Sequence, residues 1–190
     1  MSNSKTQNLV DVGDDVVRQA LSAGADVAEA LVREGSELSA RVRMGSVEMI
    51  EEARHHAVSL RVIRNHRLAL TSSSDLSEAG LRRLVLDALE LADLSQSDDF
   101  VGPADSSDLA QGPFQDLDLF DPGVESIDGA FAIDAATRAD KAARDYDPRI
   151  TNMHATTFSR ATGTTAIALS NGFRSTYSRS MVSLSSTAVA

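Results

Sequence analysis

The sequence predicts an α+β protein in which about three helices pack on one face of an antiparallel β-sheet meander. Residues 37–44 alternate strictly between polar and apolar side chains, which is typical of a half-buried strand. Residues 81–92 instead repeat apolar side chains at intervals of three and four, which indicates an amphipathic helix. Short turn sequences separate the predicted strands, and they favour sequential hairpins over a parallel sheet.

The first helix is predicted at about residues 9–23, and Gly24 is placed to end it. A meander of strands follows, with one sheet face in solvent. Its turns are expected at Gly45-Ser46 and, as a two-residue hairpin, at Asn65-His66. The strands are expected at 25–33, 37–44, 47–54, 56–62 and 68–70.

The second helix is expected at residues 76–94, where the apolar side chains form one continuous stripe. The segment Asp75–Glu78 has the chemistry of a capping box, with Asp75 as the N-cap. A third, Ala-rich helix is expected at residues 128–146 and ends before Pro148, because the residue that precedes a proline disfavours the helical conformation.

An acidic segment at about residues 95–122 separates the second and third helices. It contains seven Asp, three of the four Pro and no Lys or Arg, and it shows no periodicity. A segment of this length without secondary structure is uncommon inside a compact domain. We interpret it as a solvated excursion over the surface; the alternative is a short recognition segment.

Strands are expected again at residues 150–190. Asn171-Gly172 is typical of a type I′ hairpin turn, since both residues tolerate a positive φ. Strand-like sequence continues to Ala190, so we expect these strands to lead into a further, C-terminal β-rich domain.

The composition excludes several classes of function. The formal charge is −10, from 18 Lys and Arg against 28 Asp and Glu, which disfavours binding to nucleic acid or to an anionic membrane. The chain has no cysteine, no signal-peptide pattern and no apolar run long enough to span a bilayer. We therefore expect a soluble, cytoplasmic protein.

The four histidines do not form a recognisable metal-binding pattern. His55 and His56 are neighbours on a predicted strand, so their side chains point to opposite faces. His66 lies in a predicted turn, and His154 is distant in the chain. No helical His-Glu-x-x-His spacing is present. We predict no metal site formed by this chain alone.

Other catalytic constellations are also missing from the sequence. No Gly-x-Ser-x-Gly motif and no glycine-rich phosphate loop occur, and the serines at 72–74 are typical of a strand-to-helix connection. Adjacent carboxylates such as Glu51-Glu52 and Asp98-Asp99 give no acid/base geometry by themselves. The sequence predicts neither catalytic nor cofactor-binding residues.

The order of several short motifs is more specific than any one of them. They are Gly24–Glu29, Ser46–Ala53, Leu60-Arg61-Val62, Thr71–Ser77, Asp116–Pro122, Asp147–Ile150 and Ser170–Phe173. This succession resembles the N-terminal domain of the TldD/PmbA family of metallopeptidases, closer to the PmbA (TldE) branch. The resemblance extends over nearly the whole chain, so residues 1–190 are expected to form one such N-terminal domain.

The resemblance implies an intracellular protein more than twice this length. In this family TldD and PmbA associate, and the complex cleaves unfolded or leader peptides. The zinc-binding helix belongs to TldD-type subunits and lies beyond the matched region. The implied partners are a TldD-type subunit or a second copy, together with peptide substrates. No cofactor is expected in this chain, and zinc is expected in the partner or in the region after residue 190.

The sequence departs from the family pattern at two places. Ala57–Val62 stands where Gly-x-Gly-Leu-Arg-Val is expected, and His66 stands where the hairpin usually carries glycine. Histidine tolerates the turn conformation less well than glycine does. We interpret His66 as the replacement of a turn glycine.

Three functional hypotheses follow. The favoured one is a non-catalytic N-terminal domain of a PmbA/TldE-like subunit in a peptide-processing metallopeptidase complex. In the second, the same protein carries its own zinc site after Ala190. In the third, the chain is a stand-alone domain without enzymatic activity that binds peptides at an exposed sheet edge.

Overall fold

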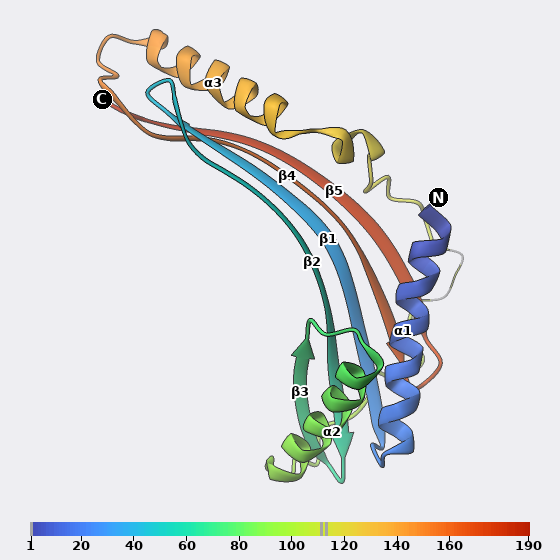
Figure 1. Ribbon diagram of the computed structural model, residues 1–190. Coiled ribbons are helices and arrows are strands. Elements are labelled where there is room, and N and C mark those ends of the chain that lie inside the picture. The colour runs from blue at the N-terminus through green and yellow to red at the C-terminus, as the bar shows by residue number, and fades with distance from the viewer. Residues whose placement is uncertain (1, 111, 113) are drawn as a thin grey trace. The chain divides into compact units, whose positions relative to one another are not determined.

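The computed structural model describes residues 2–110, 112 and 114–190, and it confirms the α+β class (Figure 1). The strands form one five-stranded sheet in the order β3-β2-β1-β4-β5. The elements are α1 (Ser2–Ser22), β1 (Val27–Arg43), β2 (Ser46–Arg64), β3 (Arg67–Ser73), α2 (Glu78–Leu94), the 3-10 helix η1 (Pro122–Ser126), α3 (Gly129–Tyr146), β4 (Asn152–Leu169) and β5 (Arg174–Val189).

The chain divides into two compact units, and the long strands contribute residues to both. The first unit comprises residues 1–34, 55–117 and 164–177, and the second comprises 35–54, 118–163 and 178–190. None of the described helices is long and apolar enough to cross a membrane.

In the first unit, α1 and α2 cover the sheet and form one apolar core with it. Alternate residues of β1 and β2, such as Val32 and Leu60, are fully buried against these helices. The helix α1 approaches β4 closely at Gly13, where an added Cβ atom would lie 3.1 Å from the Cβ of Ala168. The buried stripe of α2 comprises Leu81, Leu84, Val85, Ala88, Leu89 and Ala92, as its periodicity predicts.

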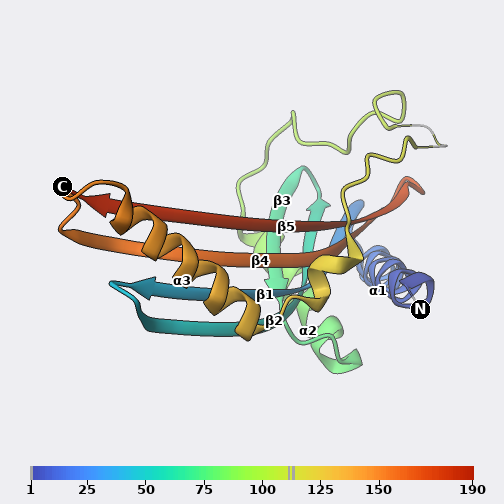
Figure 2. The same ribbon diagram turned by 90° about the horizontal axis from the view of Figure 1, so that it is seen from above.

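In the second unit, α3 lies across β1 and β4 (Figure 2). The small side chains of Ala132, Ala135 and Ala136 let α3 pack closely on Leu38 of β1. Phe158 of β4 belongs to the same apolar cluster. The ring of Phe131 meets that of Phe158 edge-on, with 5.7 Å between the ring centres. The alanine-rich sequence of α3 is therefore explained by its close contact with the sheet.

The strands are longer than the alternation pattern predicts. Segments 25–33 and 37–44 belong to the single strand β1, and segments 47–54 and 56–62 belong to β2. The alternation of buried residues is interrupted between Val32 and Leu38, yet pairing with β4 continues there, since the Ser36 and Thr162 hydroxyls lie 3.1 Å apart. Pairing with neighbours, which local alternation does not report, decides where a strand ends.

The Asn65-His66 hairpin is confirmed, with φ of 50° and 60°. The β1–β2 turn is centred on Met44-Gly45, one residue earlier than predicted. The type I′ prediction at Asn171-Gly172 is wrong, because only Gly172 of that pair has a positive φ, of 95°. Leu169 N donates a hydrogen bond to Phe173 O, and Gly172 N donates to Leu169 O. These two bonds close a three-residue loop instead.

The acidic segment at 95–122 has little regular structure in its described residues; residues 111 and 113 of this prediction lie outside them. Ser97 forms an isolated bridge with Arg67, and Arg61 donates a hydrogen bond to Gly102 O (3.2 Å). Near its end, Ser180 N of β5 donates to Leu119 O (2.9 Å). The segment is therefore attached to its surroundings at a few defined points.

Candidate functional site

All four histidines are exposed, and they belong to three different segments of the chain. His55 and His56 are in β2, His66 is in the β2–β3 turn, and His154 is in β4. Among the residues that the structure describes, no three His, Asp or Glu side chains lie where they could hold one metal ion. The histidines therefore do not fit the three-ligand arrangement of a catalytic zinc site.

His66 has the left-handed conformation that glycine adopts more easily. We expect His66→Gly to stabilise the protein by about 0.5 kcal/mol, because relief of the left-handed strain exceeds the added chain entropy of glycine. The free energy of unfolding in urea measures this. His55→Gly, in the middle of β2, should lower it by about 1 kcal/mol. A loss of stability in His66→Gly would contradict the interpretation.

The serine run connects β3 to α2 through local hydrogen bonds. Ser73 Oγ accepts from Asp75 N (3.0 Å), and an Asp75 carboxylate oxygen accepts from Ser77 N (2.9 Å). Ser77, not Asp75, is the N-cap of α2, since its hydroxyl accepts from Gly80 N (3.1 Å). The capping box predicted for Asp75 is therefore wrong, because Asp75 instead shapes the turn before the helix.

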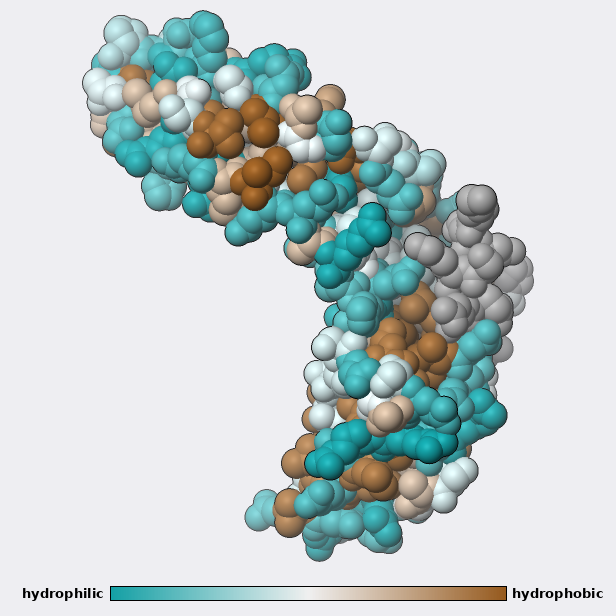
Figure 3. Space-filling model, in the orientation of Figure 1, coloured by the Kyte–Doolittle hydropathy of each residue, from teal (hydrophilic) through white to brown (hydrophobic). Residues whose placement is uncertain are grey.

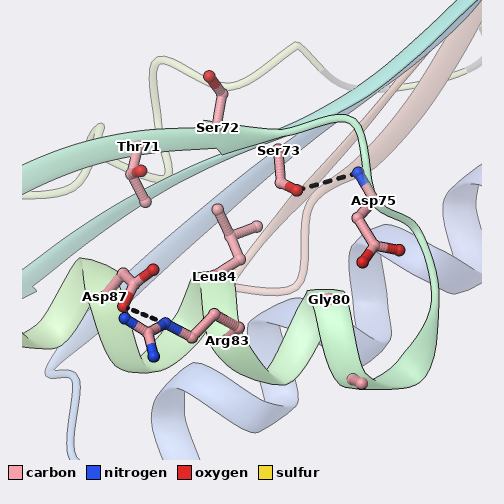
Figure 4. Close-up of a pocket in the computed structure, with 9 residues that line it drawn as sticks. Thr71, Ser72, Ser73, Asp75, Gly80, Arg83, Leu84 and Asp87 are labelled. Carbon is pink, nitrogen blue, oxygen red and sulfur yellow. Dashed lines mark hydrogen bonds and ion pairs between the residues drawn. The ribbon is translucent and has the colours of Figure 1, made fainter.

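An open pocket of about 330 Å³ lies between β3 and the first turns of α2 (Figure 4). Leu84 points from α2 toward β3, and Arg83 pairs with Asp87 across one helical turn (2.7 Å). An added Cβ atom on Gly80 would lie 2.6 Å from Asp75 O, so only glycine fits there.

Two charged groups of this pocket, Asp75 and Arg83, are not tuned for proton transfer near neutral pH. Hydrogen bonds from Ser77 hold the pKa of Asp75 below its usual value. The hydrogen bond to Asp87 raises the pKa of Arg83 above its already high value. Both shifts lead away from neutrality, whereas a general acid or base works best with a pKa near the working pH.

A buried arginine organises the second unit. Arg160 of β4 is only 6% exposed. Its guanidinium donates to Ile127 O (3.0 Å), Ser36 Oγ (2.9 Å) and Glu52 Oε1 (3.2 Å). These bonds tie Ile127, the C-cap of η1 two residues before α3, to β1 and β2. Arg160 therefore positions the start of α3 on the sheet.

A second buried charged side chain of this unit is a carboxylate. Asp140 of α3 is fully buried, and its Oδ2 accepts from Gly45 N (2.9 Å) and from Arg144 Nε (2.9 Å). It thereby holds the β1–β2 turn against α3. Neither Asp140 nor Arg160 was predicted from the sequence; a charged residue at an inward position of an alternating strand is the signal that could have revealed Arg160.

Comparison with known sequences shows where this architecture belongs. A sequence model described as PmbA/TldA metallopeptidase domain 1 matches residues 28–92, and one described as the PmbA/TldA metallopeptidase central domain matches residues 122–190. Together they span well over half of the chain. The chain belongs to the PmbA/TldD metallopeptidase family.

Two curated relatives place the chain near the PmbA members of the family. It is 36% identical over 170 residues to metalloprotease PmbA of Escherichia coli O157:H7, which covers 89% of this chain and 37% of that protein. It is 32% identical over 182 residues to a metalloprotease PmbA homolog of Haemophilus influenzae. This match covers 96% of this chain and 40% of that protein. The chain thus spans about two fifths of these relatives.

Solved structures of the family share the fold. The structure described as a modulator of DNA gyrase from Bacteroides thetaiotaomicron aligns with a TM-score of 0.84 at 21% identity, covering 92% of this chain and 39% of that one. TldE from Thermococcus kodakarensis aligns with a TM-score of 0.75 at 14% identity. The alignment covers 91% of this chain and 38% of that one. At these identities the structural likeness supports the PmbA/TldD fold alone.

Proposed function

We propose that this chain is the N-terminal, non-catalytic part of a PmbA/TldE-like subunit in an intracellular metallopeptidase complex that processes unfolded or leader peptides. The observation that carries the proposal is the 36% identity to metalloprotease PmbA over 89% of the chain. Zinc catalysis requires about three protein ligands and an open position. In this proposal a TldD-type partner, or the region after residue 190, supplies them.

Peptide binding by strand addition, without catalysis, is a second candidate. The outer strand β5 already contacts a segment of its own chain that has no regular structure, since Ser180 N donates to Leu119 O (2.9 Å) and Asp121 N donates to Ser180 Oγ (2.9 Å). The outer edge of β5 therefore offers backbone groups with which an extended peptide could pair.

Peptidase assays on an unfolded protein substrate test the proposal. The purified chain should show no cleavage with or without added zinc, because His55 and His56 are neighbours in one strand and His66 and His154 lie in separate segments. Cleavage should appear when a TldD-type subunit is added. If that mixture binds the substrate but does not cleave it, the second candidate gains support.

The control is a variant in which His55, His56, His66 and His154 are all replaced by glutamine. It should be as active as the wild type in the complex. Zinc-dependent cleavage by the isolated chain that is lost in this variant would overturn the proposal.

A further inference from the structure

The turn between β4 and β5 places an asparagine directly before a glycine. Asn171 and Gly172 are both exposed, and a Cβ atom added to Gly172 would meet nothing within 4 Å among the residues that the structure describes. On the face that Figure 3 shows, apolar residues form separate groups among hydrophilic ones, so surface composition there does not single out a site. The chemistry of the Asn171-Gly172 turn singles it out instead.

The side chain of Asn171 is folded over the peptide group that follows it. Its amide oxygen accepts a hydrogen bond from Phe173 N (3.1 Å), which closes an Asx-turn. In such a turn the side-chain carbon Cγ lies close to the backbone nitrogen of the next residue, because that nitrogen stands between the side chain and its donor. Asn171 Cγ and Gly172 N are therefore held near each other, as a reaction between them requires.

We propose that Asn171 is a site of spontaneous deamidation in the folded protein. Gly172 N loses its proton to hydroxide and forms a bond to Asn171 Cγ, while the side-chain nitrogen takes a proton from water and leaves as ammonia. The succinimide so formed then takes up one water. Opening of the bond between Cγ and Gly172 N gives aspartate, and opening of the bond between the main-chain carbonyl carbon of Asn171 and Gly172 N gives isoaspartate.

The hydrogen bond from Phe173 N stabilises the charge that develops in this reaction. Attack by Gly172 N places negative charge on the side-chain oxygen of Asn171, the atom that already accepts from Phe173 N. A backbone donor aimed at a developing oxyanion lowers the barrier of acyl transfer. The turn thus supplies both the approach of the two atoms and a donor for the oxyanion.

The turn also compensates for the hydrogen bond that the reaction removes. Gly172 N donates to Leu169 O (3.0 Å), and this bond is lost when Gly172 N gives up its proton. Leu169 O keeps a donor, because Arg174 Nη1 donates to it as well (2.8 Å). Arg174 Nη1 also donates to Phe173 O (2.9 Å), and its guanidinium pairs with Asp14 of α1. The end of the loop therefore stays fixed while Gly172 N reacts.

Two other asparagines of the chain provide internal comparisons. Asn65 precedes His66, and Asn152 precedes the fully buried Met153. A side chain on the following residue crowds its backbone nitrogen, whereas glycine has no Cβ atom. At Asn152 the side-chain oxygen accepts from Met153 N itself (2.8 Å), so the oxygen and not the carbon faces that nitrogen. Both asparagines are expected to react slowly.

Incubation of the full 190-residue chain at mildly alkaline pH, followed by peptide mapping with mass spectrometry, tests the proposal. Asn171 should convert at least about tenfold faster than Asn65 or Asn152. The conversion should become faster as the pH rises, because Gly172 N reacts only after it loses its proton. Asn171→Gln keeps a side-chain amide but must close a larger ring, and it should lower the conversion at this position at least about tenfold.

The same measurement on the chain unfolded in urea separates the turn from the sequence. A fold that buries or stiffens a reactive segment protects it, whereas this turn is expected to leave the folded rate within about tenfold of the unfolded rate. Phe173→Pro removes the N–H donor and leaves the Asn-Gly sequence unchanged. It should slow the conversion several-fold in the folded chain and not in the unfolded chain; circular dichroism checks that the variant is folded.

Three results would each overturn the proposal. The first is conversion of Asn171 no faster than that of Asn65 and Asn152, and the second is a folded rate more than about tenfold below the unfolded rate. The third is a folded Phe173→Pro variant that converts as fast as the wild type. The measurements follow the mass of one peptide and not the cleavage of a substrate, so they are independent of the metallopeptidase assignment.

Discussion

Replacement of Arg160 by alanine is expected to lower the free energy of unfolding by about 3 kcal/mol. The substitution removes the guanidinium donor of Ile127 O and leaves Ser36 Oγ with its Thr162 contact alone, and it opens a cavity beside these partly buried groups. Glu52 contributes less to this loss, because it is 61% exposed and can be solvated.

Urea unfolding followed by circular dichroism measures the Arg160 effect, and hydrogen exchange locates it. Amides of α3 and of residues 152–163 should exchange faster, whereas those of α2 should not change. Arg160→Met fills most of the space and should cost less than alanine. Arg138→Ala, on the exposed face of α3, should change stability by less than about 0.5 kcal/mol. A stability loss in Arg160→Ala no larger than in this control would contradict the assigned role.

Asp140→Ala is expected to cost about 2 kcal/mol. It removes the acceptor of Gly45 N, and it releases a turn in which Met44 and Gly45 have φ of 49° and 79°. The loss is smaller than for Arg160 because Asp140 Oδ1 is buried without a hydrogen-bond partner among the described residues, so the carboxylate itself carries a desolvation cost.

The chain offers a matched control for Asp140 on the same helix. Asp134 pairs with Arg138 at the spacing at which Asp140 pairs with Arg144, but Asp134 is 65% exposed and Asp140 is fully buried. Asp134→Ala should cost less than about 0.5 kcal/mol. Equal losses for the two substitutions would show that the helical ion pair, not the burial and the bond to Gly45, accounts for the effect.

The helices α2 and α3 and the main turn could be predicted from the sequence, whereas α1 begins at Ser2 and not at residue 9 as predicted. The apolar stripe of α2 and the proline after α3 place these helices within a few residues of their observed ends. Asn65-His66 could be recognised as a hairpin because its short connection leaves few backbone conformations. The order of motifs pointed to the PmbA/TldD family before any geometry was known.

The strand lengths, the N-cap of α2 and the buried polar contacts were decided by tertiary structure. A period of two shows which residues of a strand face a core, but it does not show how far a neighbouring strand extends; β1 and β2 each join two predicted strands for this reason. Burial of Arg160 and Asp140 depends on partners more than 90 residues away in sequence, such as Ser36 and Gly45. The part of β2 before Val58 extends beyond β3, which ends opposite that residue, and local sequence does not encode that boundary.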